Sequence, residues 1–138
     1  MTKPPSQVLE TALYADDLDA AEAFYGGVLG LEKITRAGNR HVFYRCGPGV
    51  LLIFNPDETE VHYKIGQLPV PPHGARGPGH LCFRAEAAEL DEWRARLEGA
   101  GVAIESDMEW PQGGRSIYFR DPSGNSLEFT EGRIWGIE

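Results

Sequence analysis

Three side chains able to bind a metal ion stand at related positions in this sequence. Glu10 and His80 each lie early in a segment that has the pattern of a strand and precedes a helix, and Glu128 interrupts an apolar stretch, residues 127–129. Tyr118 lies ten residues before Glu128. Two carboxylates and one imidazole carry a charge of about −2, which suits one divalent ion: Mn, Zn, Ni, Mg or Fe(II). The sequence therefore predicts a metal site of Glu10, His80 and Glu128 beside Tyr118.

Each of these residues also has a plainer interpretation. A lone glutamate on a strand more often faces water than an ion. His80 follows a Gly-Pro-Gly turn and is compatible with a turn position. Tyr118 is compatible with a wall residue whose hydroxyl contacts water. It is the combination of the three possible ligands, at positions related by a repeat, that favours a site.

The chain repeats one order of elements, strand-helix-strand-strand-strand. In the first half the segments are VLETALYA, DDLDAAEAFYGGVLG, LEKITRA, RHVFYRC and VLLIFN; in the second they are GHLCFRA, EAAELDEWRARLEGAG, VAIESDMEW, RSIYFRD and NSLEFTEG. Between them lies QLPVPPHGARGPG, whose prolines continue neither a helix nor a central strand. We expect one domain over residues 1–138: module one at 7–66, a linker at 67–79, module two at 80–132 and a tail at 133–138.

Alternation along the strands sorts the side chains onto two faces. In the second half, one face is apolar and is expected to pack on the helix: Leu81, Phe83, Ile117, Phe119, Leu127 and Phe129. The opposite face carries His80, Cys82, Ser116, Tyr118, Ser126 and Glu128. In the first half, we expect the corresponding face to carry Glu10, Ala12, Tyr14, His41, Phe43, Leu51 and Ile53. This mixture of aliphatic, aromatic and ionisable groups is typical of a ligand-binding cleft.

Four further residues are candidates for contact with a small-molecule substrate. Phe43 and Ile53 offer an apolar wall, Trp110 lies near a loop that can cover a pocket, and Arg115 can receive an anionic group. Packing in the core or on the surface is the alternative for each of them. Cys82 shares the face of His80, but we interpret it as a packed residue rather than a nucleophile.

Composition excludes several classes of partner. The net charge of −8 argues against nucleic acid and anionic membranes, which bind clustered Lys and Arg. The apolar runs are too short to span a bilayer, and the first residues lack the apolar segment of a signal peptide. Two cysteines, Cys46 and Cys82, are too few for a disulfide framework. A reducing cytoplasm is the expected location.

The sequence resembles the vicinal oxygen chelate superfamily, which includes glyoxalase I, fosfomycin-resistance enzymes, extradiol dioxygenases and bleomycin-resistance proteins. Three stretches carry the resemblance: ETALYADDLDAAEAFYGGVLGLEK, GPGHLCFRA and GGRSIYFRDPSGNSLEFTE. The resemblance implies an α+β, glyoxalase-like fold of two βαβββ modules, whose curled mixed sheets form a cleft. It also implies a homodimer.

The resemblance gives roles to individual residues. It matches His80 and Glu128 to metal ligands and Tyr118 to an active-site tyrosine. It places Glu10 where many members have histidine and some have glutamate or glutamine. A fourth ligand, present in glyoxalase I, is replaced here by Ile53. The missing ligand counts against glyoxalase I chemistry and suits a three-ligand site with open positions. Glutamate at position 10 makes Fe(II) dioxygenase chemistry less favoured.

Two functions of different class follow from these patterns. The first is a metal-dependent enzyme acting on a small oxygen-bearing substrate through Lewis-acid stabilisation of an oxyanion or enolate, as a lyase, isomerase, thiol transferase or dioxygenase. The second is a metal-free binding protein of the bleomycin-resistance type that sequesters an aromatic or cationic small molecule; an accessory ligand-binding domain without chemistry is a third possibility. Glu10, Ile53 and the acidic charge favour the second.

Overall fold

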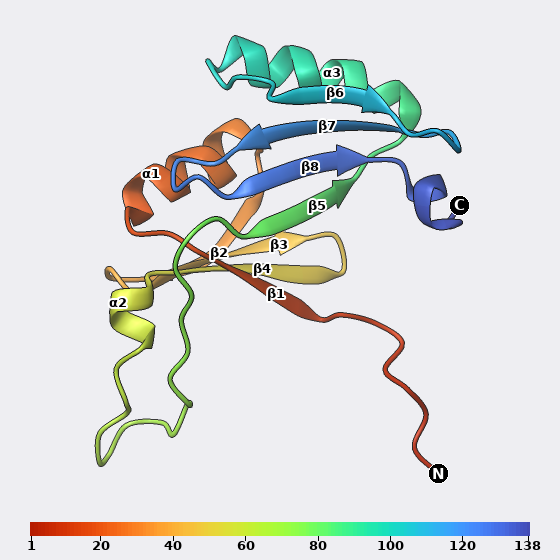
Figure 1. Ribbon diagram of the computed structural model, residues 1–138. Coiled ribbons are helices and arrows are strands. Elements are labelled where there is room, and N and C mark those ends of the chain that lie inside the picture. The colour runs from red at the N-terminus through yellow and green to blue at the C-terminus, as the bar shows by residue number, and fades with distance from the viewer. The chain divides into compact units, whose positions relative to one another are not determined.

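Each half of the chain folds into a four-stranded mixed sheet with a helix on one face, as the repeat predicted (Figure 1). The computed structural model describes residues 1–138, which form two units, Met1–Arg76 and Gly77–Glu138. The fold class is α+β, with two βαβββ modules. No helix of the chain has the length and apolar character needed to cross a bilayer.

The first unit contains β1 (Glu10–Tyr14), α1 (Leu18–Glu22), the π-helical segment η1 (Ala23–Val28), β2 (Glu32–Ala37), β3 (His41–Cys46), β4 (Gly49–Phe54) and α2 (Pro56–Thr59). The strand order is β1-β4-β3-β2, and only the β1–β4 pair is parallel. Helix α1 begins after Asp17, whose carboxylate accepts a hydrogen bond from the Ala20 amide at 3.0 Å. Helix α2 was not predicted; Asn55 caps it in the same way, at 3.1 Å from the Asp57 amide.

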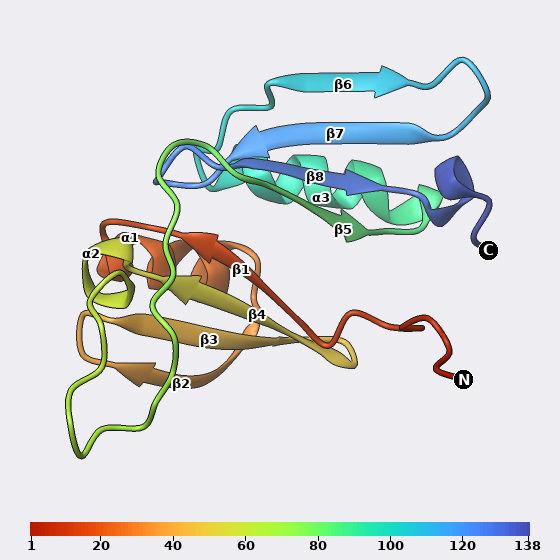
Figure 2. The same ribbon diagram turned by 60° about the horizontal axis from the view of Figure 1, so that its bottom comes forward.

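The second unit contains β5 (His80–Arg84), α3 (Ala87–Gly99), β6 (Ser106–Glu109), β7 (Arg115–Arg120), β8 (Ser126–Thr130) and the 3-10 segment η2 (Gly132–Trp135). The strand order is β5-β8-β7-β6, with β5 parallel to β8. Helix α3 runs along one face of this sheet (Figure 2). Glu86 and Glu89 form a capping box at the start of α3, with the Glu86 amide 2.8 Å from the Glu89 carboxylate.

The register of β4 corrects one sequence-based expectation. The two-residue turn at Gly47 and Pro48 pairs Cys46 with Gly49, so Val42 lies opposite Ile53 and Phe43 opposite Leu52. A shift of one residue moves every side chain to the other face. Leu51 and Ile53 are therefore 1% and 0% exposed on the face packed on the helix, and their expected place on the cleft face was wrong. Val50, Leu52 and Phe54 lie there instead.

The buried core of each unit lies between its helix and the helix-facing side of its sheet. In the first unit it joins Leu18, Ala21, Phe24 and Tyr25 to Leu13, Val42, Tyr44, Leu51 and Ile53. In the second it joins Leu90 and Leu97 to Ile117, Phe119, Leu127 and Phe129. The apolar face predicted for module two is therefore confirmed, and it leaves the opposite face free for polar chemistry.

Candidate functional site

The free face of the second sheet brings together the predicted residues of module two. The parallel β5–β8 register places Cys82 opposite Glu128, and the antiparallel β7–β8 register places Tyr118 opposite Glu128. The turn between β7 and β8 holds this register. Asp121 Oδ1 accepts hydrogen bonds from the Ser123 and Asn125 amides, both at 2.9 Å, and Asn125 Oδ1 accepts one from the Gly79 amide at 2.8 Å.

His80 is oriented by the main chain of the neighbouring strand. Its Nδ1 lies 2.9 Å from the Ser126 carbonyl oxygen, which can only accept, so Nδ1 carries the proton. In the neutral imidazole Nε2 therefore carries the lone pair, and it lies 3.3 Å from Glu128 Oε1. This is the arrangement typical of metal-ligating histidine, in which a carbonyl fixes the tautomer. Two donor atoms at that separation can both lie about 2.0–2.2 Å from one ion.

Glu128 is buried, with 5% of its surface exposed, and its second oxygen is held by a polar network. Ser116 Oγ donates to Glu128 Oε2 at 2.6 Å and accepts from Trp110 Nε1 at 2.8 Å. Thr130 Oγ1 lies 2.8 Å from Ser116 Oγ and donates to the Arg115 carbonyl oxygen at 2.9 Å. The network orders the carboxylate and leaves Oε1 directed at His80. An apolar strand can therefore carry this glutamate, because its buried carboxylate is hydrogen-bonded.

Tyr118 and Cys82 complete this face as neutral groups. The Tyr118 ring lies 6.4 Å from the His80 ring, and burial, followed by the charge of Glu128, raises the pKa of its phenol. Tyr118 therefore keeps its proton at neutral pH and can donate it in a hydrogen bond. Desolvation, followed by the charge of Glu128, raises the pKa of the Cys82 thiol to about 12. Cys82 thus lacks the thiolate character that a nucleophile needs.

Two predicted substrate contacts do not reach this face. Arg115 lies on the opposite face, where its guanidinium donates to Asp107 at 2.7 and 2.8 Å and to Asp91 at 2.7 Å. These hydrogen bonds hold the pKa of Asp107 at about 2. Arg115 shares the strand parity of Ile117 and Phe119, so it does not lie on the face of His80 and Glu128, and its role as an anion receiver stays a prediction. Ile53 likewise lies on the helix-facing side of its sheet, because of the register of β4 described above.

The sequence did not predict that Ser116 and Thr130 hold the Glu128 carboxylate in a hydrogen-bond network. It predicted Trp110 as a substrate contact rather than as a member of that network. The indole N–H of Trp110 donates to Ser116 Oγ, which in turn donates to Glu128, so Trp110 orients the carboxylate indirectly. Strand alternation could have indicated Thr130 as a neighbour of Glu128, because it follows Glu128 by two residues and therefore lies on the same face. The register also changes which residue of the first unit corresponds to Glu128. In the second unit Cys82 lies opposite Glu128, and in the first unit Ala12 lies opposite Leu52, so Leu52 rather than Ile53 stands where a fourth ligand would be.

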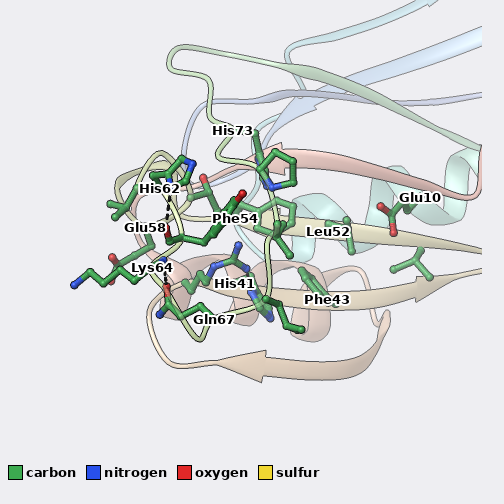
Figure 3. A pocket seen from close by; sticks show the side chains of 18 residues that line it. Glu10, His41, Phe43, Leu52, Phe54, Glu58, His62, Lys64, Gln67 and His73 are labelled. Atoms are coloured by element: carbon green, nitrogen blue, oxygen red, sulfur yellow. Dashed lines mark hydrogen bonds between the residues drawn. The ribbon is translucent and has the colours of Figure 1, made fainter.

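The first unit holds the remaining predicted residues, Glu10 and Phe43, in a pocket of about 800 Å³. Its floor is the free face of the first sheet, including His41, Leu52 and Phe54, and its side is formed by the segment from Glu58 to His73 (Figure 3). Glu10 lies at one end of this pocket and Lys64 at the other. Within either unit taken alone, no three His, Cys, Asp or Glu side chains cluster as a metal site would require.

The segment predicted as a linker is bound to the first unit over much of its length. His73 donates its amide to the Thr59 carbonyl at 2.9 Å, and its Nδ1 lies 2.6 Å from the Tyr14 hydroxyl. Arg76 pairs with Asp57 and Glu60, both at 2.8 Å. These contacts fix the wall of the pocket against the sheet.

Comparison with known proteins identifies similar sequences and structures. Residues 7–129 match the model of the Glyoxalase/Bleomycin resistance protein/Dioxygenase superfamily. The crystal structure of a lactoylglutathione lyase from Agrobacterium tumefaciens is 50% identical, covers 98% of this chain and 100% of that chain, and superposes with a TM-score of 0.90. Glutathione transferase FosA of Serratia marcescens is 30% identical over 88% of this chain and 78% of its own length. Fosfomycin resistance protein FosX of Listeria monocytogenes is 36% identical over 40% of this chain and 42% of its own length.

Proposed function

Because the chain belongs to the glyoxalase/bleomycin resistance protein/dioxygenase superfamily, we propose that it is a metal-dependent enzyme acting on a small oxygen-bearing substrate. One observation carries the proposal: His80 Nε2, its tautomer fixed by the Ser126 carbonyl, lies 3.3 Å from an oxygen of the buried Glu128 carboxylate. An imidazole nitrogen and a carboxylate oxygen, each with its second atom already hydrogen-bonded, form the donor set that divalent ions select. The two side chains therefore fit a bound metal ion.

Glu10 is the third protein ligand in this proposal. It occupies the position in β1 that His80 occupies in β5. His80 pairs with Ser126, two residues before Glu128, and Glu10 pairs with Val50, two residues before Leu52. Three protein ligands leave coordination positions for substrate oxygens. Leu52, the counterpart of Glu128 in the first unit, has no ligand atom and so does not fill one of these positions. Mn, Zn, Ni, Mg and Fe(II) are all compatible with two carboxylates and an imidazole.

The reaction proposed is of the lyase or thiol-transferase type. When bound, the ion would polarise a substrate oxygen and stabilise the oxyanion or enolate that develops during reaction. Tyr118, kept protonated, donates a hydrogen bond to a substrate oxygen. Similarity to a lactoylglutathione lyase and to a glutathione transferase supports this reaction type. Isomerase and dioxygenase activity are less favoured, the latter because glutamate stands at position 10. With Cys46 and Cys82 as free thiols, a reducing cytoplasm fits this chemistry.

A metal-free binding protein of the bleomycin-resistance type is the second candidate. The aromatic pocket of the first unit favours it, as do Glu10 in place of histidine and Leu52 in place of a ligand. Metal analysis of protein purified without a metal-affinity tag separates the two functions. The enzyme proposal expects about one divalent ion per chain and a rise in melting temperature on metal addition, as ligand binding to the native state requires. Protein that contains no metal and whose melting temperature does not change on addition of any of these divalent ions would overturn the enzyme proposal.

We expect Tyr118→Phe to keep the metal and lose activity. The ring remains against His80, and only the hydroxyl that would bind the substrate oxygen is removed. A hydrogen bond to a charged group contributes about 1.5–3 kcal/mol, so turnover should fall about 10- to 150-fold. Steady-state kinetics with the substrate, once identified, measures this loss, and metal content provides the control. Wild-type turnover would mean that Tyr118 only lines the site.

We also propose a homodimer. Several apolar side chains between residues 61 and 70 are exposed, among them Ile65 at 106% and Leu68 at 80%, and such surfaces favour association. Light scattering at micromolar concentration should give about twice the mass of one chain, 15.2 kDa. A monomer would contradict the prediction.

Mixing two defective variants tests how the dimer builds its metal site. Glu10→Ala chains are combined with His80→Ala chains, and metal binding is measured. Recovered binding would show that Glu10 of one chain completes the site of its partner. No recovery would place Glu10, His80 and Glu128 of each site within one chain.

A further inference from the structure

We propose that the pocket of the first unit binds an organic carboxylate with an apolar or aromatic body, and that Arg40 and His41 receive the carboxylate. The pocket is about 800 Å³, large enough for a ligand well beyond the size of a metal-bound fragment. Three of the four histidines of the chain line it, together with two cations, Arg40 and Lys64, and two carboxylates, Glu10 and Glu58, of which Glu58 lies near Lys64 and neither pairs with Arg40 (Figure 3). A concentration of hydrogen-bond donors in a chain of net charge −8 points to an anionic ligand.

Arg40 is available for such a ligand because no carboxylate of the protein pairs with it. Most arginines of this chain form ion pairs, for example Arg76 and Arg120 at 2.8 Å, whereas Arg40 forms none. Its guanidinium carbon instead lies 5.7 Å from the centre of the Phe54 ring, and its Nη1 donates to His41 Nδ1 at 2.8 Å. These two contacts orient the guanidinium plane and leave most of its five donors unused. A guanidinium so placed matches a carboxylate in two parallel hydrogen bonds.

His41 is a second donor at the same place, and it is neutral where Arg40 is charged. Burial, followed by the charge of Arg40, lowers its pKa, so the imidazole is uncharged at neutral pH. Since Nδ1 accepts the hydrogen bond from Arg40, the remaining proton resides on Nε2. The pair thus offers one cation and one neutral N–H donor without repulsion between two cations.

The rest of the pocket suits an apolar body. His41 stacks on Phe43 with ring centres 4.0 Å apart, and Phe54 meets the edges of Phe43 and His73 at 5.4 and 4.6 Å. Leu52 and Val70 extend this lining. We assign the anion to Arg40 rather than to Lys64, because Glu58 lies at the Lys64 end of the pocket (Figure 3).

The substrate class follows from the position of Glu10. Glu10 lines the same pocket, at the end opposite Lys64 (Figure 3), so a ligand whose carboxylate is held at Arg40 can reach a proposed metal ligand with its other end. The substrate would then be an amphiphilic acid whose oxygen-bearing reacting end lies remote from its carboxylate. This last step rests on the proposed function, but the binding of the carboxylate does not.

The test is isothermal titration calorimetry with metal-stripped protein and two probes of one shape, 2-naphthoate and the neutral 2-naphthamide. We expect 2-naphthoate to bind at one site, about tenfold or more tightly than the amide, since hydrogen bonds to charged groups are the stronger class. Arg40→Gln should remove that advantage and leave amide binding unchanged. Arg45→Gln is the matched control, because Arg45 lies on β3, which Arg40 directly precedes, pairs with Glu32 at 3.9 Å and is outside the pocket.

Several outcomes would overturn the proposal. Equal affinity of wild-type protein for acid and amide would do so without any variant, which keeps the test valid if Arg40→Gln does not fold. Unchanged binding of 2-naphthoate to a folded Arg40→Gln protein would also do so. Binding of 2-naphthoate only after metal addition would place the carboxylate at the ion instead. His80→Ala should bind 2-naphthoate as the wild type does, which separates failure of this pocket from failure of the metal site.

Discussion

His80→Ala and Glu128→Gln are each expected to abolish stoichiometric divalent metal binding while the fold persists. Each substitution removes one of three proposed protein ligands, and the affinity of a three-ligand site depends on all of them. Glu128→Gln keeps an oxygen that can accept the hydrogen bond of Ser116 Oγ, now 2.6 Å from the carboxylate, so the network around it remains satisfied. His80 is exposed, and its removal leaves no buried cavity.

Elemental analysis and equilibrium dialysis measure the loss, and circular dichroism reports the fold. Arg45→Gln is a suitable control, because that exposed arginine contacts Glu32 and no proposed ligand. Full metal content in both His80→Ala and Glu128→Gln would contradict the site and favour the binding-protein function. Loss in only one of them would remove the other from the ligand set.

Phe129→Ala is expected to lower the free energy of unfolding by about 3–5 kcal/mol, the usual effect of truncating a buried aromatic side chain. Phe129 is 4% exposed on the helix-facing side of β8. Its ring stacks on Trp93 of α3 at 4.4 Å and lies 5.4 and 5.5 Å from Phe83 and Phe119. The substitution therefore opens a cavity at the contact between helix and sheet, directly behind the strand that carries Glu128.

Urea denaturation followed by circular dichroism measures this change. Trp135→Ala is the matched control, since Trp135 is 76% exposed and its loss should change stability by no more than about 0.5 kcal/mol. Equal stabilities of Phe129→Ala and wild type would mean that this aromatic cluster does not hold α3 to the sheet.

The repeat and the faces of the second sheet were readable from the sequence because they depend on local periodicity. Alternation along GHLCFRA, RSIYFRD and NSLEFTEG assigned His80, Tyr118 and Glu128 to one face, and the register confirms it. The turn at Asp121–Asn125 was equally visible, because Asp, Pro, Gly and Asn have individual turn preferences. Family resemblance, likewise a property of sequence, gave the fold.

Other features depended on register, side-chain geometry and long-range contacts. The hairpin pairing of Cys46 with Gly49 decided that Leu52, and not Ile53, corresponds to Glu128. Which acid pairs with Arg115, and that none pairs with Arg40, depends on where side chains from distant segments meet. The contact of Tyr14 with His73 joins residues 59 positions apart and makes a pocket wall from an apparent linker. Local alternation assigned the faces of the second sheet, but in the first sheet only the pairing of the folded strands decided which face Leu52 and Ile53 take, and in both sheets only the folded chain decides which partners a side chain meets.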